Sequence, residues 1–377
     1  MGRRRGREEA IQDEPLQHYR RKMSTVSDLF AGDIRISMKT AVAVLASYPA
    51  TVAALAKIAK RLHNAERQRA RLTGKGVSVP PLMIISTTEE CNLSCKGCYA
   101  CLQGRKTGEA LPAARVSEVL DEASELGVSI VMLAGGEPLL SQNWLDAMSK
   151  HGELLGLVFT NGTLIDESRL EWFAKYRHII PVLSIEGDAA QTDARRGAGI
   201  HAKVNEAMEI LRSSGIPFGA AVTVTRQNID DVLTDNFTCE CLRKGCRLFV
   251  YVEYVPVEPG TEPLVLPKAD KKRLGDFTDQ SAAKHAALFI AFPGNEEPYG
   301  GCLAAGRGFV HISAAGGVEP CPFAPFSDVN LKNTALKDAL NSAFLARVRE
   351  NHNLLVEGDG GCALWRDREL LTALVQE

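Results

Sequence analysis

Three cysteines follow a short apolar run, and their spacing is the feature that most constrains the chain. Residues 82–87 read as a buried strand, and Cys91, Cys95 and Cys98 come directly after it as C-x3-C-x2-C. A [4Fe-4S] cluster normally takes one cysteine per iron, so three thiolates leave one iron open to a ligand that is not protein. This pattern favours chemistry over a structural role. The alternatives are a three-cysteine zinc site with an open position or three unrelated cysteines.

A second motif, Gly135-Gly136-Glu137-Pro138, follows the second expected strand. Together the two motifs resemble the radical S-adenosylmethionine (radical SAM) superfamily, whose signature is C-x3-C-x-φ-C followed downstream by GGEP. Here Gly97 takes the place of the aromatic φ, and Tyr99 follows the third cysteine instead. The resemblance runs from about residue 81 to residue 365. It is closest to members that carry a C-terminal SPASM or Twitch domain with an auxiliary cluster.

Composition sets limits on partners and compartment. The chain has 377 residues with 45% hydrophobic content, enough for a large core, and its formal net charge of −2 argues against nucleic acid as a bulk partner. Ten cysteines at metal-ligand spacings and a polar, Arg-rich start favour a reducing cytoplasm over a disulfide framework. Oxygen sensitivity is the expected consequence.

The N-terminal part allows two interpretations. Residues 40–56 carry no charge. Residues 57–75 are basic, with Glu66 as their only acidic residue; the basic residues are Lys57, Lys60, Arg61, Arg67, Arg69, Arg71 and Lys75. The apolar stretch is too short for a transmembrane helix and is interrupted by Pro49. It is either a peripheral helix on an anionic membrane surface or an extension packed on the protein with a solvated basic face.

Short β-branched runs alternate with helical stretches from residue 81 onward, a pattern typical of an α/β protein with a parallel sheet. The expected strands are 82–87, 129–134, 156–160, 179–185, 218–224 and 248–255, and the expected helices are 112–126, 143–154, 167–176, 202–214, 230–244 and 268–288. The resemblance implies a partial (β/α)6 TIM-type barrel. We expect an N-terminal helical extension (1–78), the barrel (79–258), a connecting helix region (259–293) and an auxiliary cluster domain (294–377).

The resemblance implies a SAM site at the C-terminal ends of the strands. Gly135 and Gly136 let the backbone approach a ligand closely, Glu137 adds a charge-assisted contact to the SAM ammonium, and Tyr99 and Pro138 complete the two motifs. Three further candidates close later strands. They are Asn161 and Ser184 for the ribose or adenine, and Arg196, preferred slightly over Arg195, for the SAM carboxylate.

Two other features of these strand ends are open at this stage. Asn161-Gly162 is also an ordinary turn pair. Strand alternation places Glu253 and Tyr254 on opposite faces, so only one of them lines the barrel cavity.

A second group of cysteines lies near the C-terminus. Cys302, Cys321 and Cys362 resemble the Twitch pattern, which implies one auxiliary [4Fe-4S] cluster. The fourth ligand is open, and we prefer Cys246 from the group Cys239, Cys241 and Cys246. There are four alternatives. Cys246 could be a buried core cysteine or a hydrogen-atom donor, the fourth iron could stay open to substrate, or the three C-terminal cysteines could bind zinc.

The resemblance implies an oxidoreductase-type enzyme that reductively cleaves SAM and uses the 5′-deoxyadenosyl radical to take a hydrogen atom from substrate. The expected substrate is a peptide or protein side chain or a membrane lipid, and the expected electron donor is a flavodoxin or ferredoxin. The rival hypotheses are a non-catalytic iron-sulfur relay and a zinc-stabilised binding protein.

Overall fold

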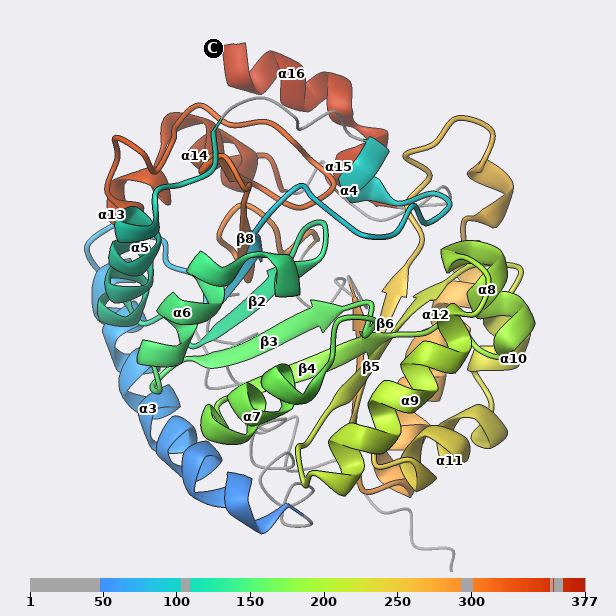
Figure 1. Cartoon of the computed structure of the whole chain (residues 1–377). Helices are drawn as coiled ribbons and strands as arrows, with labels where there is room; N and C mark the ends of the chain where they lie inside the picture. The colour runs from blue at the N-terminus through green and yellow to red at the C-terminus, as the bar shows by residue number, and fades with distance from the viewer. Residues whose placement is uncertain (1–47, 103–108, 293–300, 353–354, 356–361, 377) are drawn as a thin grey trace, which may run out of the picture.

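The computed structural model describes residues 48–102, 109–292, 301–352, 355 and 362–376. Its centre is a curled sheet with helices around the outside (Figure 1). The strands are β1 (Leu82–Ser86), β2 (Ile130–Ala134), β3 (Leu155–Thr160), β4 (Ile179–Ser184), β5 (Gly219–Val224), β6 (Leu248–Glu253), β7 (Leu288–Phe292), β8 (Phe309–Ile312) and β9 (Val318–Glu319). Their order is β7-β6-β5-β4-β3-β2-β1-β8-β9. The predicted α/β class with a partial barrel is confirmed.

The helices alternate with the strands along the chain. The longer ones are α3 (Pro49–Thr73), α5 (Ala113–Leu126), α6 (Gln142–Lys150), α7 (Glu167–Lys175), α8 (Ala189–Arg196), α9 (Ile200–Ser213), α11 (Asp235–Arg243), α12 (Lys268–Lys284), α14 (Ala343–Glu350) and α16 (Arg368–Gln376). The shorter ones are α4 (Tyr99–Leu102), η2 (Pro138–Leu140), α10 (Ile229–Val232), η3 (Glu262–Leu264), α13 (Leu336–Ala339) and α15 (Ala363–Arg366).

Parallel pairing explains why the strands are such uniform apolar runs. All pairs from β7 to β8 are parallel, and only β8 and β9 pair antiparallel. Helices cover a parallel sheet, so its strands are apolar on both faces; every residue of β1, for example, is buried. The six predicted strands are confirmed to within two residues at either end.

The sequence reading missed β7. Residues 285–288 were predicted to continue the helix, but α12 ends at Lys284 and His285 is extended, with φ −120° and ψ 144°. The run that follows pairs in parallel with β6, and Phe289 stacks on Phe249 with ring centroids 4.7 Å apart. Cross-strand aromatic packing therefore decides that this segment is a strand. Local apolar periodicity could not distinguish that strand from a continued helix.

The predicted helix 230–244 is two helices, α10 and α11. The break has a local cause, because the Thr234 side chain accepts a hydrogen bond from the Phe237 amide and so starts a new helix.

The C-terminal part of the chain shares the central sheet. β8 pairs with β1 in the register Leu82↔Phe309 to Ile85↔Ile312, and β9 extends the same sheet. A separate auxiliary domain from residue 294 stays a prediction. The strands nonetheless tie this part of the chain to the first barrel strand.

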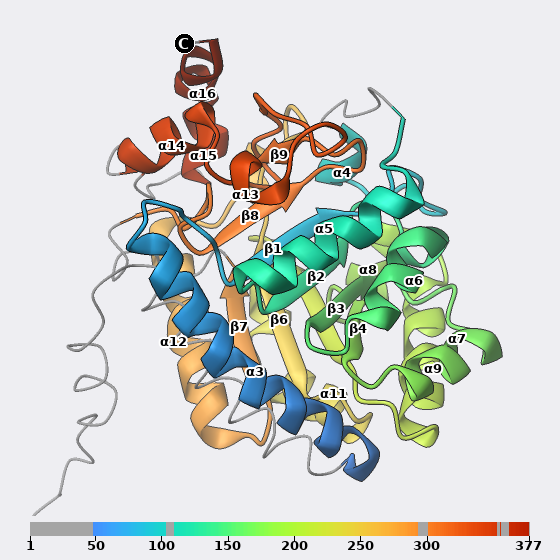
Figure 2. The ribbon, with the colours of Figure 1, turned by 90° about the vertical axis from the view of Figure 1, so that its left-hand side faces the viewer.

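The N-terminal helix α3 packs on the outside of the barrel beside α5 (Figure 2). Leu55, Ile58 and Leu62 are buried. Arg69 belongs to the core, where it donates to the Gly127 carbonyl and to Ser129 Oγ. The other basic residues of the run are exposed, namely Lys57, Lys60, Arg61, Arg67, Arg71 and Lys75. The uncharged stretch before Tyr48 lies outside the described residues, and none of the described helices is both long and apolar enough to cross a membrane.

Candidate active site and its thiol groups

A cavity of about 220 Å³ lies inside the barrel, and side chains from most strands line it. Their alternation points every second residue inward. The apolar part of the lining includes Ile84, Met132, Phe159, Val250, Val252, Ile290 and Phe292. The polar part comes from strand ends, from the loop that follows β1 and from the end of α8.

Cys91, Cys95 and Cys98 all line this cavity. Burial raises the pKa of Cys91 and of Cys95, and Arg196 and Arg195 oppose the rise at Cys95. The neighbouring cysteines of the loop also contribute to both shifts, which places the three thiols close together. No group of three or more Cys, His, Asp or Glu within the described ranges has the geometry for a single metal ion.

Cys101 lies beside this group without joining it. Its thiol contacts Cys98, and burial followed by the Cys98 charge raises the pKa of Cys101 to about 11. It is exposed and is not among the residues that line the cavity.

The two glycines of the GGEP motif bring the cysteine loop against the end of β2. The Gly136 amide donates to the Thr88 carbonyl and the Glu137 amide to the Glu90 carbonyl, both at 2.8 Å. A Cβ at Gly136 would lie 2.0 Å from the Glu90 oxygen, and one at Gly135, where φ is +111°, would lie 2.6 Å from the Thr88 oxygen. The glycines are thus required by the protein's own loop, whereas the sequence suggested only close approach of a ligand.

Glu137 is a buried connector, with 1% of its surface exposed. Its carboxylate accepts hydrogen bonds from Leu139 N at 3.1 Å, Thr160 Oγ1 at 2.7 Å and Asn161 N at 2.8 Å. Burial raises its pKa, and the three hydrogen bonds oppose that rise. This role in joining β2 to β3 was not predicted, and a direct contact with SAM stays a prediction. Pro138 begins η2 directly after it and is buried.

Asn161 is held in place by its neighbours. Its Nδ2 donates to Asn92 Oδ1 at 2.8 Å, and its Oδ1 accepts from the Thr163 amide at 2.9 Å. It therefore connects the end of β3 to the cysteine loop. Asn161, Ser184 and Tyr99 all line the cavity.

Glu186, which follows β4, organises both candidate arginines. Its Oε1 accepts from Arg195 Nη1 at 2.7 Å and from Arg196 Nη2 at 2.5 Å, and its Oε2 accepts from the Thr223 amide at 2.9 Å. Glu186 is 1% exposed. The sequence reading chose between the arginines, but the structure brings both to the cavity on one carboxylate. The signal that could have found Glu186 is its place in the Ser-Ile-Glu-Gly segment.

The comparisons with known proteins agree with this geometry. The family model described as "Radical SAM superfamily" matches residues 85–235. Residues 85–235 form a radical SAM domain. The match runs from the end of β1 through β5 and includes the cysteine loop, the GGEP turn and both arginines. The protein is therefore an enzyme of the radical SAM type, and its cofactors are SAM and [4Fe-4S] iron-sulfur clusters.

Relatives extend beyond that domain. An AdoMet-dependent heme synthase of Methanosarcina barkeri is 24% identical over 72% of this chain and 84% of its own. A PqqA peptide cyclase of Gluconobacter oxydans is 27% identical over 64% of this chain and 70% of its own. The crystal structure of SuiB of Streptococcus suis bound to its precursor peptide SuiA aligns with a TM-score of 0.58 at 24% identity, covering 74% of this chain and 69% of that one. The structural likeness supports the fold, and enzyme-named relatives do not favour the relay or binding-module hypotheses.

A second thiol group lies next to residues that line the radical SAM cavity. The pKa of Cys321 is raised well above its ordinary value by burial, by contact with the Cys362 thiol and by the charge of Cys302. The structure thus brings together three cysteines that are far apart in sequence. Pro322 and Phe323, next to Cys321, line the cavity, and Phe323 packs edge-on against Tyr99 with ring centroids 5.1 Å apart.

Cys246 does not belong to this group. It is fully buried at the start of β6, its thiol donates to the Leu248 carbonyl at 3.2 Å, and its thiol neighbour is Cys241. Tyr48 donates to the adjacent Gly245 carbonyl at 2.8 Å, so this is the end of the barrel covered by the beginning of α3. This position contradicts the prediction of Cys246 as the fourth cluster ligand. The core-cysteine alternative describes it correctly.

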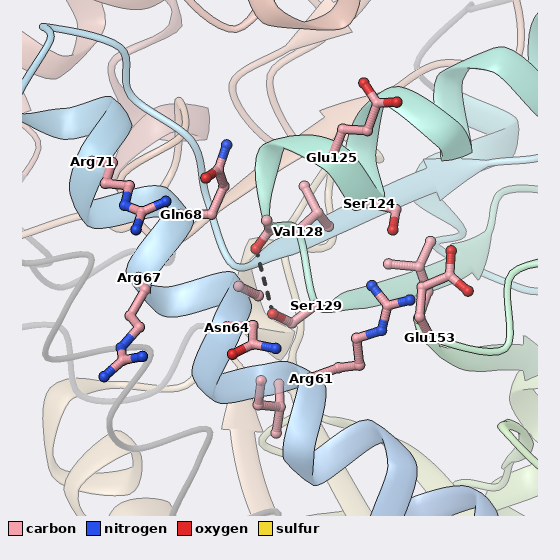
Figure 3. A pocket seen from close by; sticks show the side chains of 14 residues that line it. Arg61, Asn64, Arg67, Gln68, Arg71, Ser124, Glu125, Val128, Ser129 and Glu153 are labelled. Atoms are coloured by element: carbon pink, nitrogen blue, oxygen red, sulfur yellow. Dashed lines mark hydrogen bonds between the residues drawn. The ribbon is translucent and has the colours of Figure 1, made fainter.

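Another cavity, of about 410 Å³, lies between α3 and the turn that joins α5 to β2 (Figure 3). Arg61, Arg67 and Arg71 line it from α3, and Ser129 and Glu153 line it from the barrel. It contains none of the ten cysteines and lies outside the radical SAM site.

Proposed function

We propose that this radical SAM enzyme abstracts a hydrogen atom from an apolar side chain of a peptide substrate. The observation that carries the proposal is the composition of the lining of the central cavity. The three cysteines, Arg195 and Arg196 line it together with aliphatic and aromatic groups of β6 and β7 such as Val252, Ile290 and Phe292. An apolar chamber favours a hydrocarbon group of the substrate over a charged one.

The relatives support a peptide as the carrier of that group. The printed names of two of them refer to peptides, a PqqA peptide cyclase and SuiB with its precursor peptide. A membrane lipid is the competing substrate, since its acyl chain would also suit the apolar lining.

We assign the first cluster to Cys91, Cys95 and Cys98. When bound there, the reduced cluster supplies the electron that cleaves SAM to methionine and the 5′-deoxyadenosyl radical. Arg195 and Arg196 hold positive charge at the cavity wall and suit the SAM carboxylate, with Arg196 the less exposed of the two. Asn161 and Ser184 present polar groups for the ribose or adenine, and Tyr99 lines the same cavity, whereas Pro138 lies behind the lining, buried at the start of η2.

We assign an auxiliary cluster to Cys302, Cys321 and Cys362, with its fourth position open. The role of these residues would be to hold a second redox centre next to Pro322 and Phe323, which line the cavity. The three thiols are buried or half-buried and lie close together, which supports this assignment.

The test follows the transfer of deuterium from substrate to the nucleoside product. Anaerobically reconstituted enzyme is reduced with dithionite in the presence of SAM and of fractions from fully deuterated bacteria, either peptides or lipids. Deuterium in 5′-deoxyadenosine with the peptide fraction is the expected result. Transfer from the lipid fraction alone would contradict the peptide assignment, and failure to form the nucleoside would contradict the catalytic site itself.

We infer that a flavodoxin or ferredoxin delivers the electron and that the protein works in the cytoplasm, because the thiols need a reducing compartment. The exposed Lys and Arg residues of α3 support peripheral contact with an anionic membrane. Flotation with vesicles that contain anionic lipid tests this contact. Replacement of Lys57, Lys60 and Arg61 by Gln is expected to abolish it.

A further inference from the structure

Gly97 stands between two cluster cysteines at the position where the motif normally has an aromatic residue. Its φ is +63° and it has no side chain. A Cβ built on it would lie 2.3 Å from Tyr254 Oη, 2.8 Å from Tyr254 Cε2 and 3.0 Å from Tyr254 Cζ. The ring of Tyr254 therefore occupies the space beside the motif that a side chain at residue 97 would need.

Tyr254 is fixed from a distant part of the chain. It follows β6 directly, its amide donates to the Val224 carbonyl at 3.0 Å, and only 3% of its surface is exposed. A few residues later, Glu258 Oε2 accepts the Gly97 amide hydrogen at 3.0 Å. The segment after β6 thus holds Gly97 through two separate contacts.

The hydroxyl of Tyr254 is the unusual part of this arrangement. It is buried and has no hydrogen-bond partner among the described residues. A buried hydroxyl normally has a partner, so one without it calls for an explanation such as a water, an ion or a cofactor beside the protein atoms. The Tyr254 oxygen would lie 2.3 Å from a Cβ at Gly97, and Tyr254 lines the same cavity as Cys95 and Cys98, so this hydroxyl lies beside the cluster loop.

Tyr254 and its neighbour Glu253 differ in where their polar groups lie. Both Glu253 and Tyr254 line the cavity, so the expectation that only one of them does is wrong. The carboxylate of Glu253 nevertheless turns toward Lys271 of α12, with Oε2 3.1 Å from Nζ. The Tyr254 hydroxyl instead lies beside Gly97.

We propose that Tyr254 replaces the aromatic side chain missing from the motif and donates its hydroxyl hydrogen to a sulfur of the cluster held by Cys91, Cys95 and Cys98. The proposal rests on the proposed site of the first cluster. Hydrogen bonds to cluster sulfurs help to set the reduction potential. Such a bond stabilises the reduced, more negative state and therefore raises the potential. Tyr254 is thus a positioning and tuning residue for the electron transfer.

The test replaces the hydroxyl and keeps the ring. Tyr254→Phe in the reconstituted full-length enzyme is expected to bind the same number of irons but to have a more negative midpoint potential for the cluster whose electron paramagnetic resonance signal responds to SAM. Tyr251→Phe is the matched control, since Tyr251 lies on β6 three residues before Tyr254 and packs edge-on against Phe277 of α12. It should leave the potential of that cluster unchanged.

Each other outcome has a definite meaning. An unchanged potential in Tyr254→Phe overturns the hydrogen bond to the cluster. An unchanged potential together with weaker SAM binding, measured by equilibrium dialysis, also overturns it and moves the hydroxyl contact to SAM. If the unsubstituted protein binds no irons after reconstitution, that result would instead contradict the assignment of the cluster to the three cysteines.

Discussion

Arg196 donates two hydrogen bonds to one oxygen of Glu186, from Nε at 2.9 Å and from Nη2 at 2.5 Å. The same oxygen accepts a third from Arg195 at 2.7 Å. One buried carboxylate therefore fixes two guanidinium groups at the wall of the cavity and leaves a net positive charge there. This arrangement suits an anionic group of a cofactor or substrate.

Removal of that carboxylate should be costly. Glu186→Gln leaves two largely buried guanidinium groups without a counter-charge, and breaking a buried ion pair in this way costs about 3–5 kcal/mol. We expect a loss at the lower end of that range in chemical denaturation, because the side chains of Arg195 and Arg196 are 19% and 10% exposed. We also expect SAM binding to weaken at least about tenfold (about 1.4 kcal/mol).

The control is Glu209→Gln. Its contact with Arg212 is long, at 3.8 Å, and both side chains are more than half exposed. Such a pair contributes little to stability. A similar loss in both variants would show that Glu186 is not a special organiser of the site.

Gly136→Ala should prevent correct formation of the cysteine loop. The added Cβ would meet the Glu90 carbonyl at 2.0 Å, and this neighbour is backbone that cannot rotate away. Overpacking of this kind costs about 1–3 kcal/mol. We expect the iron content of reconstituted protein to fall towards half and nucleoside formation to be lost.

Gly275→Ala is the matched control for that substitution, since nothing lies within 4 Å of a Cβ at Gly275 in α12. It should reconstitute like the unsubstituted enzyme and be slightly more stable, by about 0.5–1 kcal/mol. Normal iron content in Gly136→Ala would show that the loop can move away from the β2 turn.

The two groups of cysteines predict opposite results for Cys321 and Cys246. Cys321→Ala should lower the iron count from about eight to about four, since each [4Fe-4S] cluster has four irons. Cys246→Ala should keep about eight, because its thiol packs in the core against Leu248 and Cys241. Iron and sulfide analysis distinguishes the two, and a loss of four irons in Cys246→Ala would restore it as a cluster ligand.

His178 predicts a dependence of stability on pH. Burial lowers its pKa below the ordinary value of 6.5, and a hydrogen bond to the Met148 carbonyl at 2.9 Å opposes this shift. The folded state therefore favours the neutral imidazole, while the unfolded chain takes up a proton as the pH falls through about 6.5. Stability from this residue is present above that pH and is lost below it.

The measurement compares unfolding midpoints at pH 7 and pH 5. His178→Gln keeps a donor for Met148 but cannot titrate, so its midpoint should fall less than that of the unsubstituted protein. Each unit of pKa depression corresponds to about 1.4 kcal/mol. Parallel decreases in the two proteins would show that other groups cause the acid sensitivity.

Local motifs could be predicted from the sequence because their function depends on residues that are close together in the chain. The spacing of Cys91, Cys95 and Cys98 after an apolar strand predicted their common loop, and the structure places all three on one cavity. Strand positions were equally readable, since a parallel sheet buries both faces and so produces continuous apolar runs. The missed β7 shows the limit, because its state depends on pairing with β6.

By itself, therefore, the sequence determined the α/β class, the positions of the first six strands along the chain, the open three-cysteine loop and the likeness to radical SAM proteins. Only the tertiary structure decided which distant groups meet. It left Cys246 outside the group of Cys302, Cys321 and Cys362 that the resemblance had implied, put both arginines on Glu186 and laid Tyr254 against Gly97. The physical reason is that these contacts depend on strand register and on which face of a strand a side chain occupies, and neither is encoded in the spacing of residues along the chain.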